Sequence, residues 1–139
     1  MLGGLLPRSP TVSIGVRHAG ICYNETMKVD HYCFGKIIIN GKTYASDVII
    51  YPDSVDSSWW RKEGHYLRPV DLDKALGTKP DLLIIGTGFS GLMVVPEETV
   101  LFIISKGIKV LVERTEQATE LFNSLSEDGN VVAAFHLTC

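Results

Sequence analysis

The sequence predicts a compact, three-layer α/β domain with a mixed, partly parallel sheet and an amino-terminal β-hairpin. Two observations support this prediction. The second half alternates apolar, strand-like runs with helix signals, which is the order of a parallel sheet with right-handed crossovers. The first half places Asn40-Gly41, the strongest short hairpin signal, between two β-branched runs, which adds antiparallel strands.

Strands and one short helix are predicted in the first half. Residues 36–40 and 43–51 are rich in β-branched and aromatic residues, and they form the two arms of the hairpin. Residues 59–67 predict a short strand with a loop at Gly64. Asp71 is a suitable N-cap for a helix that Gly77 and Pro80 end.

The second half reads as three strands and two helices. Strands are predicted over residues 82–85, 108–112 and 131–135, because each is a short apolar run. Pro96 suits the first turn of a helix over residues 97–106, although its β-branched content leaves a strand as the alternative. Thr115 is expected to cap the last helix, which Gly129 ends.

Composition restricts the classes of function. The 139 residues, 45% of them hydrophobic, describe one domain, and the net charge of −3 offers no basic field to nucleic acid or an anionic membrane. No apolar run reaches the roughly 18 residues that cross a bilayer. Three cysteines without a CxxC pattern favour a reducing, cytoplasmic location.

Residues 1–30 differ in texture from the rest. Their apolar residues follow neither a helical nor a strand period, and Pro7 and Pro10 disrupt the amphipathic helix of an organelle transit peptide. The apolar stretch is too short for a secretory signal. We therefore expect a poorly ordered extension over residues 1–30, with Met27 as an alternative start, and one α/β domain over residues 31–139.

A glycine motif follows the strand predicted over residues 82–85. Gly86-Thr87-Gly88-Phe89-Ser90-Gly91 matches the dinucleotide fingerprint, but Pro96 delays the helix that should present N–H groups to a pyrophosphate. No nucleotide or other cofactor is therefore expected. Gly86, Thr87 and Gly88 remain candidates for binding a small anion or carboxylate, and the alternative is a tight strand exit with positive φ.

The segment WWRKEGH holds the densest set of functional side chains. Arg61 could clamp a carboxylate or phosphate with two hydrogen bonds, with Lys62 beside it, and the alternative is a solvated charged face. His65 is either an acid/base group or an ordinary loop histidine. Asp47 lies among apolar neighbours, where a carboxylate is costly unless paired, so it is a partner for Arg61 or Lys62, or a pocket acid.

Metal binding and a cysteine nucleophile are not expected. His31, Cys33, His136 and Cys139 lie in two separate pairs with weak ligand spacing, so they do not form a closed ligand set. His136 and Cys139 are three residues apart, which on a strand directs their side chains to opposite faces.

Several segments together resemble a known family. The segments FGKIIINGKTY, DVIIYPDSV, WWRKEGH, PDLLIIGTG, KGIKVLVERTEQATELFN and FHLTC are similar to the MTH-type domain of unknown function, found in the adipogenesis-associated domain-containing protein and a mitochondrial complex I assembly factor. The resemblance spans residues 31–139 and implies a three-layer α/β fold and a role in assembly or regulation. By position it carries over residues 86–88, Arg61, Lys62 and residues 136–139.

Two functional hypotheses follow. The first is a non-enzymatic interaction or assembly module with a small anion- or carboxylate-binding pocket, a protein partner and a homodimeric state favoured by the apolar hairpin. The alternative is a small enzyme or ligand-binding protein that joins residues 86–88 to Arg61 and uses Asp47 or His65 as acid/base. The absence of a complete catalytic constellation favours the first.

Overall fold

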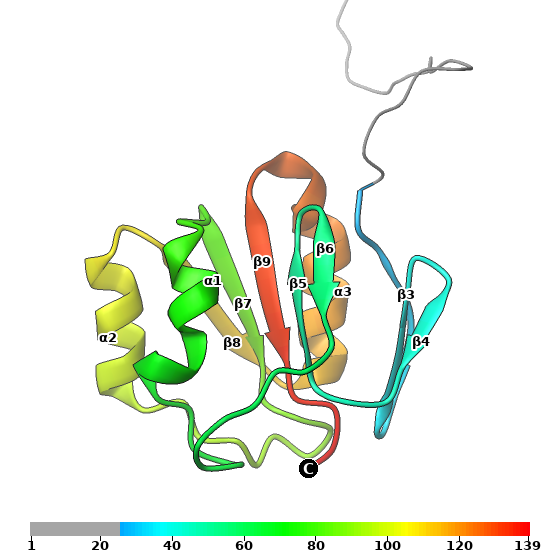
Figure 1. The fold of residues 1–139 in the computed structure, drawn as a ribbon, viewed down its shortest axis with the longest axis horizontal. Coiled ribbons are helices and arrows are strands. Elements are labelled where there is room, and N and C mark those ends of the chain that lie inside the picture. The colour runs from blue at the N-terminus through cyan, green and yellow to red at the C-terminus, as the bar shows by residue number, and fades with distance from the viewer. Residues whose placement is uncertain (1–25) are drawn as a thin grey trace, which may run out of the picture.

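The computed structural model describes residues 26–139 (Figure 1). Residues 1–25 of the expected poorly ordered extension (residues 1–30) lie outside the described residues. The first described strand, β2 (Val29–Cys33), begins two residues before the predicted start of the domain.

Two sheets and three α-helices are formed by residues 26–139. The main sheet has the order β6-β5-β9-β7-β8, and the smaller one has the order β2-β3-β4. The main strands are β5 (Val48–Tyr51), β6 (Ser54–Asp56), β7 (Leu82–Gly86), β8 (Lys109–Glu113) and β9 (Val131–Phe135). The remaining elements are β3 (Lys36–Ile39), β4 (Lys42–Tyr44), α1 (Asp73–Gly77), α2 (Glu97–Ser105) and α3 (Thr115–Leu125). Strand β7 is parallel to β8 and β9, and β5 is antiparallel to β9, so the predicted mixed α/β fold is confirmed.

The main sheet is the middle of three layers, because successive residues of a strand point to opposite faces. Leu83, Ile85 and Val132 pack in one buried cluster with residues of α1 and α2. Ile84 and Ala133 pack in a second cluster with residues of α3 and the three-stranded sheet. Each face of the main sheet is thus covered (Figure 1).

The predicted hairpin is confirmed in its turn but not in its length. Asn40 (φ 48°) and Gly41 (φ 82°) lie in the left-handed region and join β3 to β4, as a two-residue hairpin loop requires. The strand predicted over residues 43–51 is instead two strands in different sheets, because the chain leaves the small sheet after Tyr44 and enters the main sheet at Val48.

Two local predictions in the first half are wrong. Residues 59–67 form no strand, and their β-pairing is limited to two isolated bridges, one from Glu63 to Tyr66 and one from Tyr66 to Val94. The indole of Trp59 donates to the Asp71 carbonyl at 2.9 Å, which holds this segment as a loop. Asp71 does not cap α1. It lies within a 3₁₀ turn over Pro69–Leu72, and its carboxylate accepts the N–H groups of Arg68 and Lys62.

The second half follows the prediction closely. Helix α2 forms directly after Pro96, so the strand alternative is wrong there. Thr115 is the first residue of α3 rather than its cap, because its hydroxyl is used in a tertiary contact described below. Within residues 26–139, no helix combines the length and apolarity that a membrane crossing requires.

Candidate functional site at the carboxyl edge of the sheet

The candidate site lies where the parallel strands β7 and β9 end, at the lower edge of the sheet in Figure 1. The N–H of His136, directly after β9, donates to the carbonyl of Gly86 at 3.0 Å. The antiparallel strand β5 starts at the same edge, which brings Asp47 beside the end of β9. Residues from three separate segments therefore meet there.

Asp47, Arg61 and His136 form a hydrogen-bonded group that we call the Asp47 cluster. The Asp47 Oδ2 atom lies 2.8 Å from both Arg61 Nη2 and His136 Nδ1. The other carboxylate oxygen, Oδ1, accepts the N–H of Leu137 at 2.8 Å. Of the three roles weighed for Asp47, the structure shows the ion pair with Arg61 and adds His136 to it.

The Asp47 cluster is buried. The side chains of Arg61, His136 and Asp47 are 5%, 6% and 18% exposed. Burial alone would raise the pKa of Asp47, but hydrogen bonds from His136, the Leu137 N–H and Arg61 outweigh it and lower this pKa from 3.8 to about 2. Asp47 is therefore ionised at neutral pH and neutralises Arg61.

Two polar atoms of the Asp47 cluster have no hydrogen-bond partner in the described part of the chain. Arg61 uses Nε on the carbonyl of Gly64 and Nη2 on Asp47, and its buried Nη1 bonds to nothing described. His136 directs Nδ1 at Asp47, and its buried Nε2 is likewise unpartnered. Such atoms cost about 1–3 kcal/mol each when nothing bonds to them.

His65 and Lys62 occupy different positions relative to this cluster. The exposed His65 ring packs edge-on against His136, with 5.4 Å between ring centroids. Trp59 stacks under Arg61, whose guanidinium carbon lies 4.6 Å from the indole ring. Lys62 is exposed, and its backbone N–H donates to Asp71, so the structure brings His65 to the cluster but shows no contact for the Lys62 side chain.

The space beside the glycine loop, residues 86–91, is occupied by other segments of the chain. The N–H groups of Thr87 and Gly88 donate to the Glu113 carbonyl (2.9 Å) and the Thr115 hydroxyl (2.8 Å). A Cβ at Gly86 would lie 2.8 Å from the Thr115 hydroxyl, and one at Gly88 would approach the Cys139 backbone, so close packing requires both glycines. The loop N–H groups proposed to hold an anion are thus engaged within the protein.

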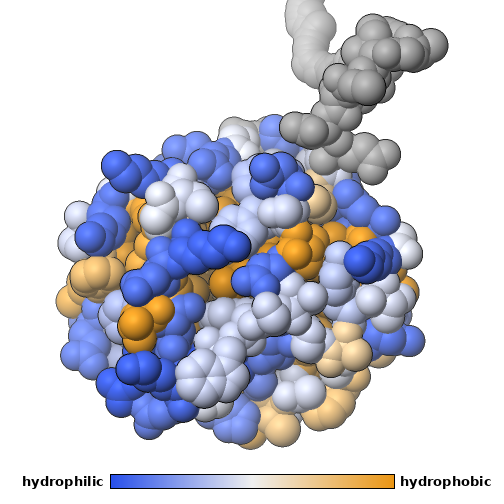
Figure 2. All heavy atoms as spheres, viewed as in Figure 1, coloured by the Kyte–Doolittle hydropathy of each residue, from blue (hydrophilic) through white to orange (hydrophobic). Residues whose placement is uncertain are grey.

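Exposed apolar side chains lie on three loops near the carboxyl edge, and we call them the apolar rim. They are Phe34, Trp60, Phe89, Leu92 and Val94, which are 54%, 74%, 48%, 56% and 52% exposed. The rings of Phe34 and Phe89 touch, with 5.8 Å between centroids. The N–H groups of Phe89 and Leu92 donate to the Thr138 and Cys139 carbonyls, which fixes this loop beside the segment after β9. Figure 2 shows pale-orange apolar surface on the right-hand part of this lower edge, next to blue and white surface on its left.

The sequence patterns did not predict the contact between His136 and Asp47, because they presented His136 only as a partner of Cys139, as a metal ligand or as part of the segment shared with the family. A signal was available. His136 directly follows one apolar strand and Gly86 ends another, and because these two strands are parallel, both residues lie at one edge of the sheet. Among the described residues, no three His, Cys, Asp or Glu side chains form a group that could hold a metal.

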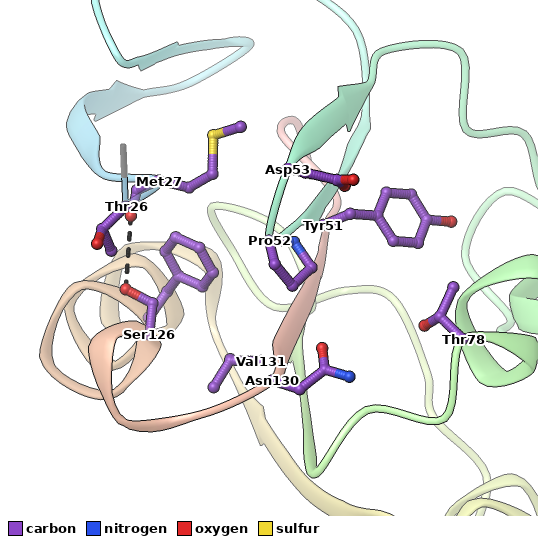
Figure 3. A pocket seen from close by; sticks show the side chains of 10 residues that line it. Thr26, Met27, Tyr51, Pro52, Asp53, Thr78, Ser126, Asn130 and Val131 are labelled. Atoms are coloured by element: carbon purple, nitrogen blue, oxygen red, sulfur yellow. Dashed lines mark hydrogen bonds between the residues drawn. The ribbon is translucent and has the colours of Figure 1, made fainter. Parts of the chain in front are cut away.

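A cavity away from these residues lies at the opposite edge of the main sheet. It has a volume of about 590 Å³, and its lining includes Tyr51, Asn130 and Val131 around the amino end of β9. Figure 3 shows Met27 and Pro52 across from Val131, with Asn130 below them. Asp53 is its one charged lining residue, so this cavity contains none of the predicted site residues.

Comparisons with known proteins find a family without an assigned activity. A family model described as "Protein of unknown function (DUF498/DUF598)" matches residues 29–136. The chain is similar to the crystal structure of the conserved hypothetical protein PH1505 from Pyrococcus horikoshii OT3, at 27% identity over 81% of this chain and 100% of that chain, with a TM-score of 0.70. It is similar to MT938 at 26% identity over 82% of this chain and 100% of that chain, with a TM-score of 0.64. A Mth938-like domain from Bordetella pertussis shares the fold at 20% identity over 86% of this chain and 92% of that chain, with a TM-score of 0.58.

Proposed function

The chain belongs to the DUF498/DUF598 family of unknown function and is an MTH-type domain, and we propose that it is an interaction module that binds a carboxylate-bearing segment of a partner protein. The binding face is the carboxyl edge of the main sheet. The partner segment places apolar side chains on the apolar rim and directs one carboxylate at the Asp47 cluster.

One observation carries this proposal: Arg61 Nη1 is a buried donor without a described acceptor. An arginine N–H bonds most strongly to an anionic oxygen. Asp47 already accepts from Nη2, so a carboxylate from outside would accept a hydrogen bond from Nη1 without displacing Asp47. Because the loop N–H groups are engaged, the side chains of the cluster are the donors left for an anion.

Access to Arg61 depends on His65. This exposed side chain packs against the buried His136, and we infer that a rotation of His65 about its side-chain bonds opens an approach to the cluster. Side-chain rotations of exposed residues are fast and need no change of fold. The apolar rim supplies the contact area that a single carboxylate lacks.

The test is a fluorescence titration that uses the exposed Trp60 as reporter. The probes are two acetylated hexapeptides of leucine and phenylalanine, one with a central aspartate and one with asparagine in its place. We expect a saturable blue shift, with about tenfold tighter binding of the aspartate peptide, equivalent to about 1.4 kcal/mol. Arg61→Gln should abolish that preference, whereas Leu92→Ser should weaken both peptides equally.

Two results would overturn the proposal. One is equal affinity of the folded wild-type protein for the two peptides. The other is an aspartate preference that survives in Arg61→Gln, with circular dichroism verifying that this variant is folded. Lys62→Gln is the matched control, because it removes a neighbouring positive charge that makes no described side-chain contact.

A second candidate function is hydrolysis with His136 as general base. The observation that favours it is the 2.8 Å contact from Asp47 Oδ2 to His136 Nδ1, which orients the imidazole as in Asp-His pairs of hydrolases and leaves Nε2 unpartnered. Turnover of p-nitrophenyl acetate that is lost in both His136→Gln and Asp47→Asn, but kept in His65→Gln, would support it. Turnover equal in all four proteins would exclude this role.

The proposal includes a cytoplasmic location. The thiols of Cys33 and Cys139 are both unpaired in the structure, which is the ordinary state in a reducing compartment. Alkylation of intact cells followed by mass spectrometry would show whether these thiols are reduced in place.

A further inference from the structure

We propose that the protein forms a symmetric dimer in which β8 pairs antiparallel with β8 of a second copy. The surface involved is the outer edge of the main sheet, away from the carboxyl edge, so this inference is independent of the proposed function. It differs from the hairpin surface from which we expected a homodimer, and it rests on backbone, charge and apolar features of β8 and α2.

Strand β8 ends the main sheet, and no strand among residues 26–139 pairs with its outer side. The Lys109 N–H donates to Asp81 and the Glu113 carbonyl accepts from Thr87, so these residues direct their backbone groups at β7 and its flanks. In a parallel ladder alternate residues face opposite sides, which leaves the N–H and C=O groups of Val110 and Val112 facing outward. These four groups are a template for another strand.

The sequence of β8, Lys-Val-Leu-Val-Glu, is self-complementary in charge. A two-fold axis at Leu111 places Val110 opposite Val112 of the second copy, where the outward groups of both residues can exchange hydrogen bonds. The same register places Lys109 opposite Glu113 of the second copy, and this pair occurs twice. Directly opposed residues have Cβ atoms about 5 Å apart, at which opposite charges attract.

Helix α2 adds apolar surface beside this edge. Its Ile103 is buried, yet Leu101 and Ile104 on its other sides are 56% and 50% exposed, and a helix that is apolar all round is normally covered. Phe102 lines a cavity of about 260 Å³ together with Leu76 of α1. Ile104 lies about 200° further around the helix, so it faces away from α1. In the dimer, both α2 helices lie on the same face of one continuous sheet.

On the face of the sheet opposite α2, acidic side chains form a site for Lys109 of the second copy. Glu113 lines a cavity of about 410 Å³ with Glu120 and Gln117 of α3. The side chains of Lys109, Leu111 and Glu113 share the face of the sheet that α3 covers, because they alternate with the valines. Pairing therefore brings Lys109 of each copy to the mouth of the other copy's acidic cavity, which is the charge complementarity that selects a second copy.

The test measures the oligomeric state of the full chain by sedimentation equilibrium from micromolar to submillimolar concentration. We expect a wild-type dimer, and Lys109→Glu or Glu113→Lys alone should raise its Kd by about tenfold or more, because each creates like-charge pairs. An equimolar mixture of the two variants should dimerise again, since it restores two opposite-charge pairs. The double variant, with the charges exchanged, should also dimerise.

Lys106→Glu is the matched control, because it changes the same charge near the carboxyl end of α2, on the flank that faces α1. Circular dichroism of each variant verifies folding. A wild-type protein that stays monomeric at submillimolar concentration overturns the proposal, and the charged strand ends then protect an exposed edge instead. So does a dimer whose Kd is the same in both single charge variants.

Discussion

The two ends of the main sheet differ in an instructive way. At the amino end of β9 the sheet borders a cavity of about 590 Å³ with one charged lining residue. At the carboxyl ends of β7 and β9, the chain fills the space with its own last residues, yet this edge holds the buried Asp47 cluster. The comparison teaches that the open cavity and the buried charged groups lie at opposite edges of the sheet, because the edge with the Asp47 cluster is closed by packing.

The strongest test of this comparison is the close packing at Gly88. Gly88→Ala should lower the free energy of unfolding by about 3 kcal/mol, because its φ of 107° strains a side chain and the new Cβ would meet the Cys139 backbone. Urea denaturation measures the change.

Gly107→Ala separates the two causes. Gly107 has a φ of 82° but no atom within 4 Å of an added Cβ, so its replacement should cost about 1 kcal/mol from backbone strain alone. Equal effects of the two alanines would mean that the carboxyl edge is not tightly packed by residues 138 and 139.

Removal of one charge from the Asp47 cluster should have the next largest effect. Arg61→Leu leaves the largely buried carboxylate of Asp47 with His136 and the Leu137 N–H but without its arginine, and should lower the free energy of unfolding by about 2–3 kcal/mol. Lys28→Gln breaks an exposed ion pair with Glu127 and should leave the urea midpoint unchanged. An Arg61 effect as small as that of Lys28 would show that the cluster is solvated.

Acid pH should lower the free energy of unfolding by a smaller amount, through Asp47 at the same edge. The folded pKa of Asp47 is lowered to about 2, so its stabilising contribution is complete above about pH 4 and is lost as the pH falls toward 2. We expect a contribution of about 1–2 kcal/mol, allowing for its partial exposure.

The comparison for this titration is the pH dependence of urea unfolding in wild type and Asp47→Asn. The variant should lose less stability between pH 4 and 2, whereas Asp53→Asn, at an exposed carboxylate by the opposite edge, should follow the wild type. Identical curves for all three proteins would contradict the assignment to Asp47.

The smallest effect is expected at the amino edge. Asn130→Ala enlarges a cavity that is already open, and the Asn130 backbone N–H keeps its contact with Asp81, so stability should change by less than about 0.5 kcal/mol. The aspartate preference in the peptide titration should also be unchanged. A loss of peptide binding in this variant would move the binding face to the hollow edge.

Local patterns were enough to predict most of the fold. The Asn40-Gly41 turn, the apolar runs of β7 and β9 and the start of α2 after Pro96 are encoded within a few residues, by turn chemistry and apolar periodicity. The strand predicted over residues 59–67 was wrong because a hydrogen bond from the Trp59 side chain to the distant Asp71 carbonyl overrides the strand propensity of these residues.

The sequence by itself determined the α/β class, the elements of the second half and the membership of Asp47 and Arg61 in the set of candidate residues. Only the tertiary structure decided that these two residues meet His136, which is 89 positions from Asp47 and 75 from Arg61. The physical reason is that β9 pairs antiparallel with β5 and parallel with β7, and this order of strands, which no local pattern encodes, brings the ends of all three to one edge.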